Sequence, residues 1–182
     1  MSLPVPGRFV VPDVVATNFH LREGDQVADL GAGSGFFLKS LSNAVGESGR
    51  VYACEIQKQL VEKLGEQARM QGLSNIHPLW CDLEEENGIP LADESLDAAV
   101  LVNTFFLFED RPAGVREAYR VLRRGGSLHL VDWSESFGGL GPQPAQVVTR
   151  DAAAALFEEA QFILEREYSA GDHHYGVTFR KP

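Results

Sequence analysis

The chain has 182 residues and a mass of 20.0 kDa, and with 44% hydrophobic and 23% charged residues its composition excludes an intrinsically disordered chain. Its formal net charge is −10, from 16 basic and 26 acidic residues, which disfavours free nucleic acid and anionic membrane surfaces as partners. No segment approaches the roughly 20 apolar residues of a membrane helix, and the start of the chain lacks the pattern of a secretory signal. We therefore expect a cytoplasmic protein without a membrane span.

Short apolar runs alternate with amphipathic helical stretches from residue 26 onward, which is the pattern of βα units that build a mostly parallel sheet. A short helix over residues 12–19 precedes them. The apolar runs are bounded by Gly, Asp or Asn, and they predict five parallel strands at 27–30, 50–55, 76–81, 96–102 and 127–133. Apolar residues at helical spacing predict crossover helices around 37–45, 60–68 and 111–122, the last closed by the glycines at 125 and 126.

The last fifty residues follow a different pattern. A loop rich in glycine and proline at 138–144 leads into a helix at 149–160. Two strands at 162–169 and 175–180, separated by residues 170–172, predict an antiparallel hairpin. The chain therefore reads as a single domain over 1–182, with an N-terminal arm and short helix (1–25), a core (26–133), and a loop, helix and closing hairpin (134–182).

The most informative stretch is Gly31-Ala32-Gly33-Ser34-Gly35, which follows the first strand and opens a helix. Glycines at such a turn allow positive φ angles and let a ligand approach the backbone N–H groups, although a tight turn without a ligand has the same pattern. The dinucleotide fingerprint needs a glycine at the sixth place, where this chain has Phe36. A nicotinamide-dependent reductase is therefore disfavoured.

Acidic residues accompany three successive strands. Asp29 lies in the first strand, Glu55 ends the second and Asp82 follows the third. Glu55 or Asp82 alone reads as a solvated strand end, but the carboxyl ends of parallel strands meet at one edge of a sheet, where ligands bind. Together with the glycine turn they predict a cofactor site, in which Glu55 can accept hydrogen bonds from two ribose hydroxyls.

These motifs, in this order, resemble those of class I S-adenosylmethionine-dependent methyltransferases, and the loop at 89–95 and the V-L-x-x-G-G junction at 121–126 resemble the ubiquinone/menaquinone-biosynthesis type, which acts on small molecules. The resemblance covers about residues 25–133. It implies an α/β, Rossmann-like, doubly wound, mostly parallel seven-stranded sheet that ends in an antiparallel C-terminal hairpin, with helices on both faces. It also implies that S-adenosylmethionine is the cofactor and S-adenosylhomocysteine the product. The cofactor-binding residues that it implies are Asp29, Gly31, Ala32, Gly33, Gly35, Glu55, Ile56, Cys81, Asp82, Leu83 and Asn103.

Candidate catalytic residues are Asn103, Asp132 and His173, because an acceptor that must lose a proton needs a base near the ends of the fourth and fifth strands or on the closing hairpin. The segment that begins at Asn103 resembles the N-P-P-aromatic signature of amino-group methyltransferases but lacks both prolines. The apolar run at 105–108 reads as core or as the wall of an acceptor pocket. His173 and His174 read as solvated turn residues, and His20 as part of a lid.

The predicted function is methyl transfer from S-adenosylmethionine to a small-molecule acceptor by in-line displacement. The alternative is a non-catalytic module or partner subunit that binds S-adenosylmethionine or S-adenosylhomocysteine, because no helical insertion between residues 133 and 149 caps an acceptor site. That site would be open, or completed by another subunit, as in a homodimer. Cys54 and Cys81 lie in predicted core strands, which fits a reducing compartment and argues against an arsenite methyltransferase, and they lack the CxxC or His spacing of a metal site.

Overall fold

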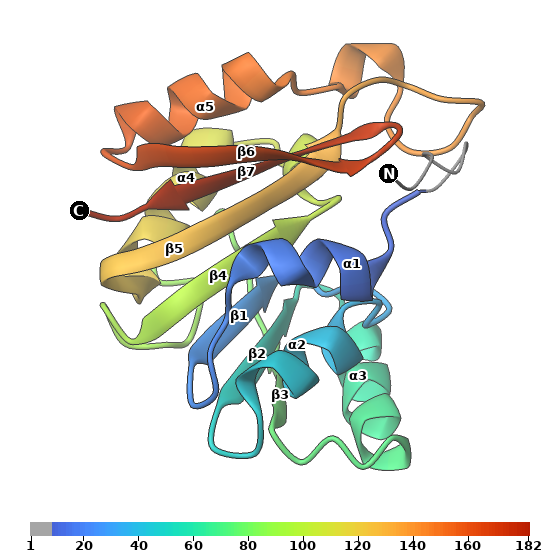
Figure 1. The fold of residues 1–182 in the computed structure, drawn as a ribbon, viewed down its shortest axis with the longest axis vertical. Helices are drawn as coiled ribbons and strands as arrows, with labels where there is room; N and C mark the ends of the chain where they lie inside the picture. The colour runs from blue at the N-terminus through green and yellow to red at the C-terminus, as the bar shows by residue number, and fades with distance from the viewer. Residues whose placement is uncertain (1–8) are drawn as a thin grey trace, which may run out of the picture.

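The computed structural model describes residues 9–182, so the first eight residues of the predicted N-terminal arm lie outside the described part. Within it, one sheet has the strand order β3-β2-β1-β4-β5-β7-β6 (Figure 1). The first five strands run parallel to one another, and β7 runs antiparallel to both of its neighbours. The strands are β1 (Gln26–Leu30), β2 (Arg50–Glu55), β3 (Ile76–Trp80), β4 (Leu96–Val102), β5 (Leu122–Trp133), β6 (Ile163–Gly171) and β7 (His174–Arg180).

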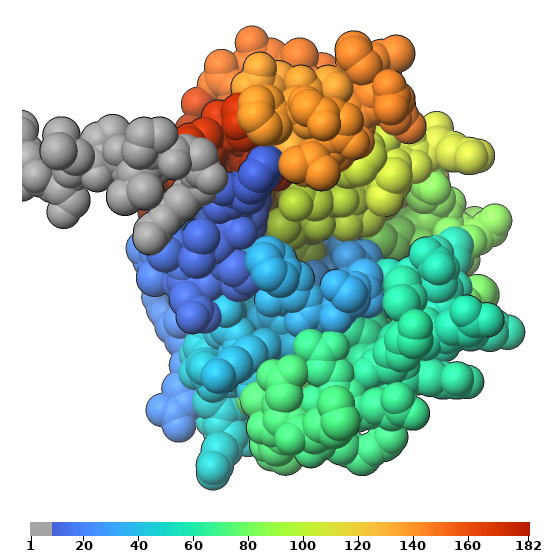
Figure 2. Space-filling view, turned by 90° about the vertical axis from the view of Figure 1, so that its right-hand side faces the viewer, coloured from blue at the N-terminus to red at the C-terminus, as the bar shows by residue number. Residues whose placement is uncertain are grey.

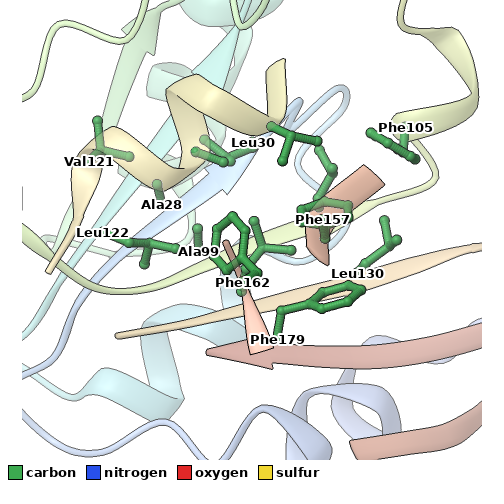
Figure 3. Close-up of a cluster of buried hydrophobic side chains, with 14 of the residues drawn as sticks. Ala28, Leu30, Ala99, Phe105, Val121, Leu122, Leu130, Phe157, Phe162 and Phe179 are labelled. Carbon is green, nitrogen blue, oxygen red and sulfur yellow. The ribbon is translucent and has the colours of Figure 1, made fainter. Parts of the chain in front are cut away.

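Helices cover both faces of this sheet, as expected for a doubly wound fold (Figure 1). One face carries α1 (Pro12–Ala16), α2 (Leu38–Val45) and α3 (Lys58–Met70), whose apolar residues form one buried cluster with that face. The other carries α4 (Arg111–Val121) and α5 (Arg150–Glu159), which pack on a second cluster that includes Phe157, Phe162 and Phe179 (Figure 3). Short 3₁₀ turns are η1 (Thr17–Phe19), η2 (Phe105–Leu107) and η3 (Pro144–Gln146).

The junction between α4 and β5 differs from the prediction. The helix ends at Val121 and the strand begins at once, because Leu122 is extended and pairs with Leu96 of β4. Gly125 and Gly126 therefore lie inside β5 rather than capping the helix. A Cβ at Gly126 would lie 2.8 Å from the carbonyl oxygen of Arg123, so the glycine allows a close backbone approach where β4 and β5 shift register.

Asp97 and His129 are held by contacts within the fold. The Asp97 carboxylate accepts hydrogen bonds from the Gln26 N–H at 2.8 Å and from the Arg123 guanidinium at 2.6 Å. His129 is buried, stacks on Phe19 and bonds to Thr178 and Ser127. Across residues 9–182, none of the helices combines the length and the apolar character that crossing a bilayer would need.

Candidate functional site

A cleft of about 880 Å³ opens at the carboxyl ends of the parallel strands, where the segments after β1, β2, β3 and β4 meet. Figure 2 shows this face, on which the blue-to-cyan segment after β1 adjoins the yellow-green segment after β4. Ten of the eleven residues predicted to bind the cofactor line the cleft. They are Asp29, Gly31, Ala32, Gly33, Glu55, Ile56, Cys81, Asp82, Leu83 and Asn103.

The glycine turn forms the floor of the cleft between β1 and β2. Its start is fixed because the N–H groups of Gly31 and Ala32 both donate to the Cys54 carbonyl oxygen, at 2.9 and 2.8 Å. Gly33 has a φ of 54°, and the nearest atom to a Cβ there would be the Gly31 carbonyl oxygen at 4.0 Å, so the glycine leaves room for a ligand against the backbone. The turn is therefore held rigidly on β2 and bare on its cleft side.

Gly35 is the one predicted cofactor residue outside the described lining of the cleft. Its φ is 81°, and a Cβ there would lie 2.9 Å from side-chain atoms of both Leu38 and Leu64. Gly35 thus lies in a tight contact between the turn, α2 and α3, where the structure leaves no room for a side chain.

The three predicted carboxylates converge on the cleft. Glu55 is buried, and its two carboxylate oxygens accept hydrogen bonds from the N–H groups of Gly33 at 3.0 Å and Gln57 at 2.9 Å. Asp82 accepts one from the Glu84 N–H at 3.1 Å. Burial, with the neighbouring Glu55 charge, raises the pKa of Asp29 to about 7. This end of the cleft is therefore suited to a positively charged ligand.

The segment after β4 forms the opposite wall. Asn103 has a φ of 54°, a left-handed conformation that Asn tolerates better than most residues, and its N–H donates to the Val131 carbonyl oxygen at 2.8 Å. Thr104 donates to the Gly31 carbonyl oxygen at 3.3 Å and packs where a Gly31 Cβ would lie. Leu107 and Phe108 line the cleft whereas Phe105 is buried core, so the apolar run belongs partly to the core and partly to the cleft wall.

The other two candidate catalytic residues lie outside the described cleft lining. Asp132 is buried, and its oxygens accept from the N–H groups of Phe106 at 2.9 Å and Trp133 at 2.8 Å. Burial raises its pKa to about 7, against the lowering effect of those hydrogen bonds. His173 pairs with Glu135 at 2.7 Å and stacks on Phe137.

Two other histidines do not lie where the sequence placed them. His174 was expected to be a solvated turn residue, but it is only 5% exposed because it pairs with Trp133 at the start of β7 and packs against that ring. His20, expected in a lid, lies at the opposite edge of the sheet beside Asp97, where its ring contacts Arg166.

Sequence reasoning also missed several residues of the cleft, since their positions depend on loop geometry rather than on a motif. Only their proximity to the motifs in the chain pointed to them. These residues are Ser34, Phe36, Gln57, Leu60, Thr104, Glu109 and Asp110.

The sheet order, the glycine turn and the acidic strand ends define the fold and site of a class I S-adenosylmethionine-dependent methyltransferase. Residues 28–130 match the methyltransferase domain family, and the chain belongs to this family.

Individual proteins agree with this assignment. A structure titled as a SAM-dependent methyltransferase from Aquifex aeolicus is 30% identical, with a TM-score of 0.86 over 93% of this chain and 89% of that one. The ubiquinone/menaquinone biosynthesis C-methyltransferase UbiE of Haemophilus ducreyi is 30% identical over 116 residues, 63% of this chain and 44% of the relative. An arsenite methyltransferase of Aquipseudomonas alcaligenes is 34% identical over 116 residues, 62% of this chain and 34% of the relative. The chain thus spans less than half the length of these curated relatives.

The cleft fits the cofactor of this family. Bare backbone at Gly33 leaves room for a ligand, and the acidic groups suit the positive charge of S-adenosylmethionine. Each Glu55 oxygen accepts one backbone hydrogen bond and has a second lone pair for a ribose hydroxyl.

Cys54 and Cys81 are fully buried, and the nearby Cys81 thiol and burial raise the pKa of Cys54.

Proposed function

We propose that this chain binds S-adenosylmethionine in the cleft and catalyses transfer of its methyl group to a small-molecule acceptor. The observation that carries the proposal is the meeting of Asp29, Glu55 and Asp82 around a bare glycine turn, in a chain of the methyltransferase domain family. When bound, the cofactor supplies a methyl group activated by a positively charged sulfur. The chain's own residues then have to hold, orient and desolvate the reactants.

Each carboxylate has a proposed part in holding the cofactor. Glu55, already fixed by two N–H donors, accepts the ribose hydroxyls, and Asp82 accepts from the adenine amino group. Ile56 lies against the adenine face, as the family motif implies. Buried Asp29 holds the amino group of the methionine part and supplies negative charge below the glycine turn.

Residues at the end of β4 are proposed to face the reacting atoms. Asn103 is the candidate catalytic residue that lines the cleft, and its left-handed backbone is the kind of strain that persists at functional sites. Leu107 and Phe108 exclude water from the same wall. Asp132 acts differently: by accepting the Phe106 N–H it ties the segment after β4 to β5, so we assign it as a positioning residue.

Calorimetric titration tests the proposal, with S-adenosylmethionine, S-adenosylhomocysteine and NADH as separate ligands. We expect micromolar affinity for the two sulfur ligands, near −8 kcal/mol, and none for NADH. Glu55→Gln should weaken binding, whereas Glu66→Gln, a change on the exposed face of α3, should not. Failure of the purified chain to bind either sulfur ligand would refute the proposal. If the sulfur ligands bind, turnover against a panel of acceptors excludes a module that only binds them.

Cellular location, domain organisation and the class of acceptor are part of the same proposal. The two buried free cysteines are consistent with a reducing compartment, and we propose a cytoplasmic protein made of one methyltransferase-like domain. The net charge of −10 supports a small-molecule acceptor over free nucleic acid.

A further inference from the structure

Buried polar atoms without hydrogen-bond partners are rare in proteins, and each one needs an explanation. Within residues 9–182, side-chain atoms of this kind come from three residues: the Asn103 Oδ1, the Tyr168 hydroxyl, and both ring nitrogens of His174. His174 is 95% buried, since only 5% of it is exposed. Leaving such groups unsatisfied is costly, which favours a purpose other than stability.

The strand registers bring these three residues to one region of the sheet. Asn103 donates its N–H to Val131 of β5, Val131 pairs with Gly176 of β7, and Gly176 pairs with Tyr168 of β6. Val102 is the β4 residue that pairs with Val131, so Val102, Val131, Gly176 and Tyr168 form one row across neighbouring strands, which are spaced about 4.8 Å apart, and Asn103 directly follows Val102. His174 lies two residues before Gly176, on the same face of β7.

The Tyr168 side chain extends along this row. A Cβ at Gly176 would lie 2.2 Å from Tyr168 Cε2 and 2.5 Å from Cζ, so the distal part of the ring covers the glycine. The hydroxyl is therefore carried across β7 in the direction of β5 and β4. A glycine at position 176 is what allows the tyrosine to reach inward.

The row continues into the cofactor cleft. Val102 pairs with Val131, lines the cleft, and packs against the same buried cluster as Val131 and Tyr168. Asn103, the next residue, lines the cleft as well. Tyr168 thus lies on the face of the sheet that α1 covers, and Asn103 lies where this row reaches the wall of the cleft.

We propose that Asn103, Tyr168 and His174 bind the methyl acceptor and select an acceptor with an apolar body and an uncharged hydrogen-bonding group. The inference rests on the proposed function. Val102, Val131 and the Trp133 ring beside His174 supply apolar contacts. A neutral imidazole offers one donor and one acceptor, a phenol hydroxyl offers both, and an amide oxygen accepts. None of these groups neutralises a full charge on the acceptor.

Protonation supports the preference for an uncharged group. Burial, with the charge of neighbouring His173, lowers the pKa of His174 to about 4, so its ring is neutral at pH 7. Phe9 lies over this end of the sheet, in ring contact with Trp133, Phe137 and His173. Figure 2 shows the blue start of the described chain next to the orange loop after β5.

Nuclear magnetic resonance of protein labelled with ¹⁵N in its histidine rings tests the inference. S-adenosylhomocysteine is added first, so failure of the proposed function is seen at that step. Phenol and benzamide are then titrated as uncharged probes, and benzoate as a charged one. We expect phenol and benzamide to shift the ring signals of His174 but not those of His77, and benzoate to bind more weakly. Binding of S-adenosylhomocysteine without any probe effect at His174 overturns the inference.

Variants give the second readout. Tyr168→Phe and His174→Phe should weaken phenol binding about threefold to tenfold, the effect of one hydrogen bond, and leave S-adenosylhomocysteine binding unchanged. Tyr52→Phe, on the far strand β2, should change neither. Equal phenol affinity in both hairpin variants and the parent chain overturns the assignment.

Thermal melting separates this assignment from a structural one. Tyr168→Phe removes a hydroxyl without a partner, so Tm should stay the same or rise. Tyr175→Phe is the matched control on the same hairpin, because its hydroxyl donates to the Val148 carbonyl oxygen at 3.1 Å and its loss should lower Tm. A fall in Tm for Tyr168→Phe as large as that for Tyr175→Phe would show a hydroxyl satisfied within the protein and overturn the inference.

Discussion

Cofactor affinity should depend on pH through Asp29. Burial and the Glu55 charge raise the pKa of Asp29 to about 7, so in the ligand-free protein this carboxyl is mostly protonated at pH 6 and mostly ionised at pH 8. A cationic ligand favours the ionised form and must displace the proton at the lower pH. With one proton displaced, Kd for S-adenosylmethionine should be about tenfold weaker at pH 6 than at pH 8, or about 1.4 kcal/mol.

Calorimetry in two buffers of different ionisation enthalpy measures both the affinity and the number of protons released. We expect close to one proton released at pH 6 and almost none at pH 8. Asp29→Asn should bind more weakly than the parent chain at both pH 6 and pH 8, and show no slope between them. An affinity that is flat from pH 6 to pH 8, or a slope that survives in Asp29→Asn, would refute the reasoning. In the ligand-free chain, the same raised pKa means that this group's contribution to stability is present below about pH 4 and is lost as pH rises through about 7.

Three substitutions test other parts of the structure. Glu55→Ala should weaken cofactor binding by roughly 1.5–3 kcal/mol for each charge-assisted hydrogen bond lost, measured by titration beside a thermal melt; unchanged affinity would contradict its ribose role. Gly35→Ala should cost about 1–3 kcal/mol of stability through backbone strain and overlap with Leu38, while the folded protein keeps parental affinity; lost affinity with unchanged stability would place Gly35 in the site instead. Arg120→Met leaves Glu117, whose side chain is 6% exposed, without the cation that lies 2.8 Å away. The expected loss is about 3–5 kcal/mol in urea unfolding, and a loss below about 1 kcal/mol would contradict this view of the pair.

The fold was predictable because its signals are local. Buried parallel strands read as apolar runs, and Thr149, expected at the start of the last helix, is its N-cap and accepts the Ala152 N–H through its side chain. The start of β5 was missed because pairing with β4 overrides the glycines that would otherwise end the helix there. Leu122 pairs with Leu96, a contact distant in sequence that no local pattern contains.

Part of the candidate site could likewise be predicted from the sequence, and part could not. Residues of the glycine turn and the strand ends are placed by chain connectivity alone, so ten of them line one cleft as predicted. Asp132 and His173 were chosen by residue type. Residue type does not reveal that two backbone N–H groups already bond to the oxygens of Asp132, or that His173 pairs with Glu135. The burial of His174 depends on Trp133 of the neighbouring strand, a contact that forms only in the folded chain.

The hydrogen bonds that hold Glu55 have a consequence for discrimination between substrate and product. Because the Gly33 and Gln57 N–H groups fix this carboxylate before any ligand arrives, little rotamer entropy is lost on binding. That gain is common to S-adenosylmethionine and S-adenosylhomocysteine, which share the ribose. The proposed ribose contact at Glu55 therefore favours both ligands equally, and we expect product inhibition. Preference for the charged substrate, and release of the product, must come from a charge that acts on the sulfonium, for which neighbouring Asp29 is our candidate.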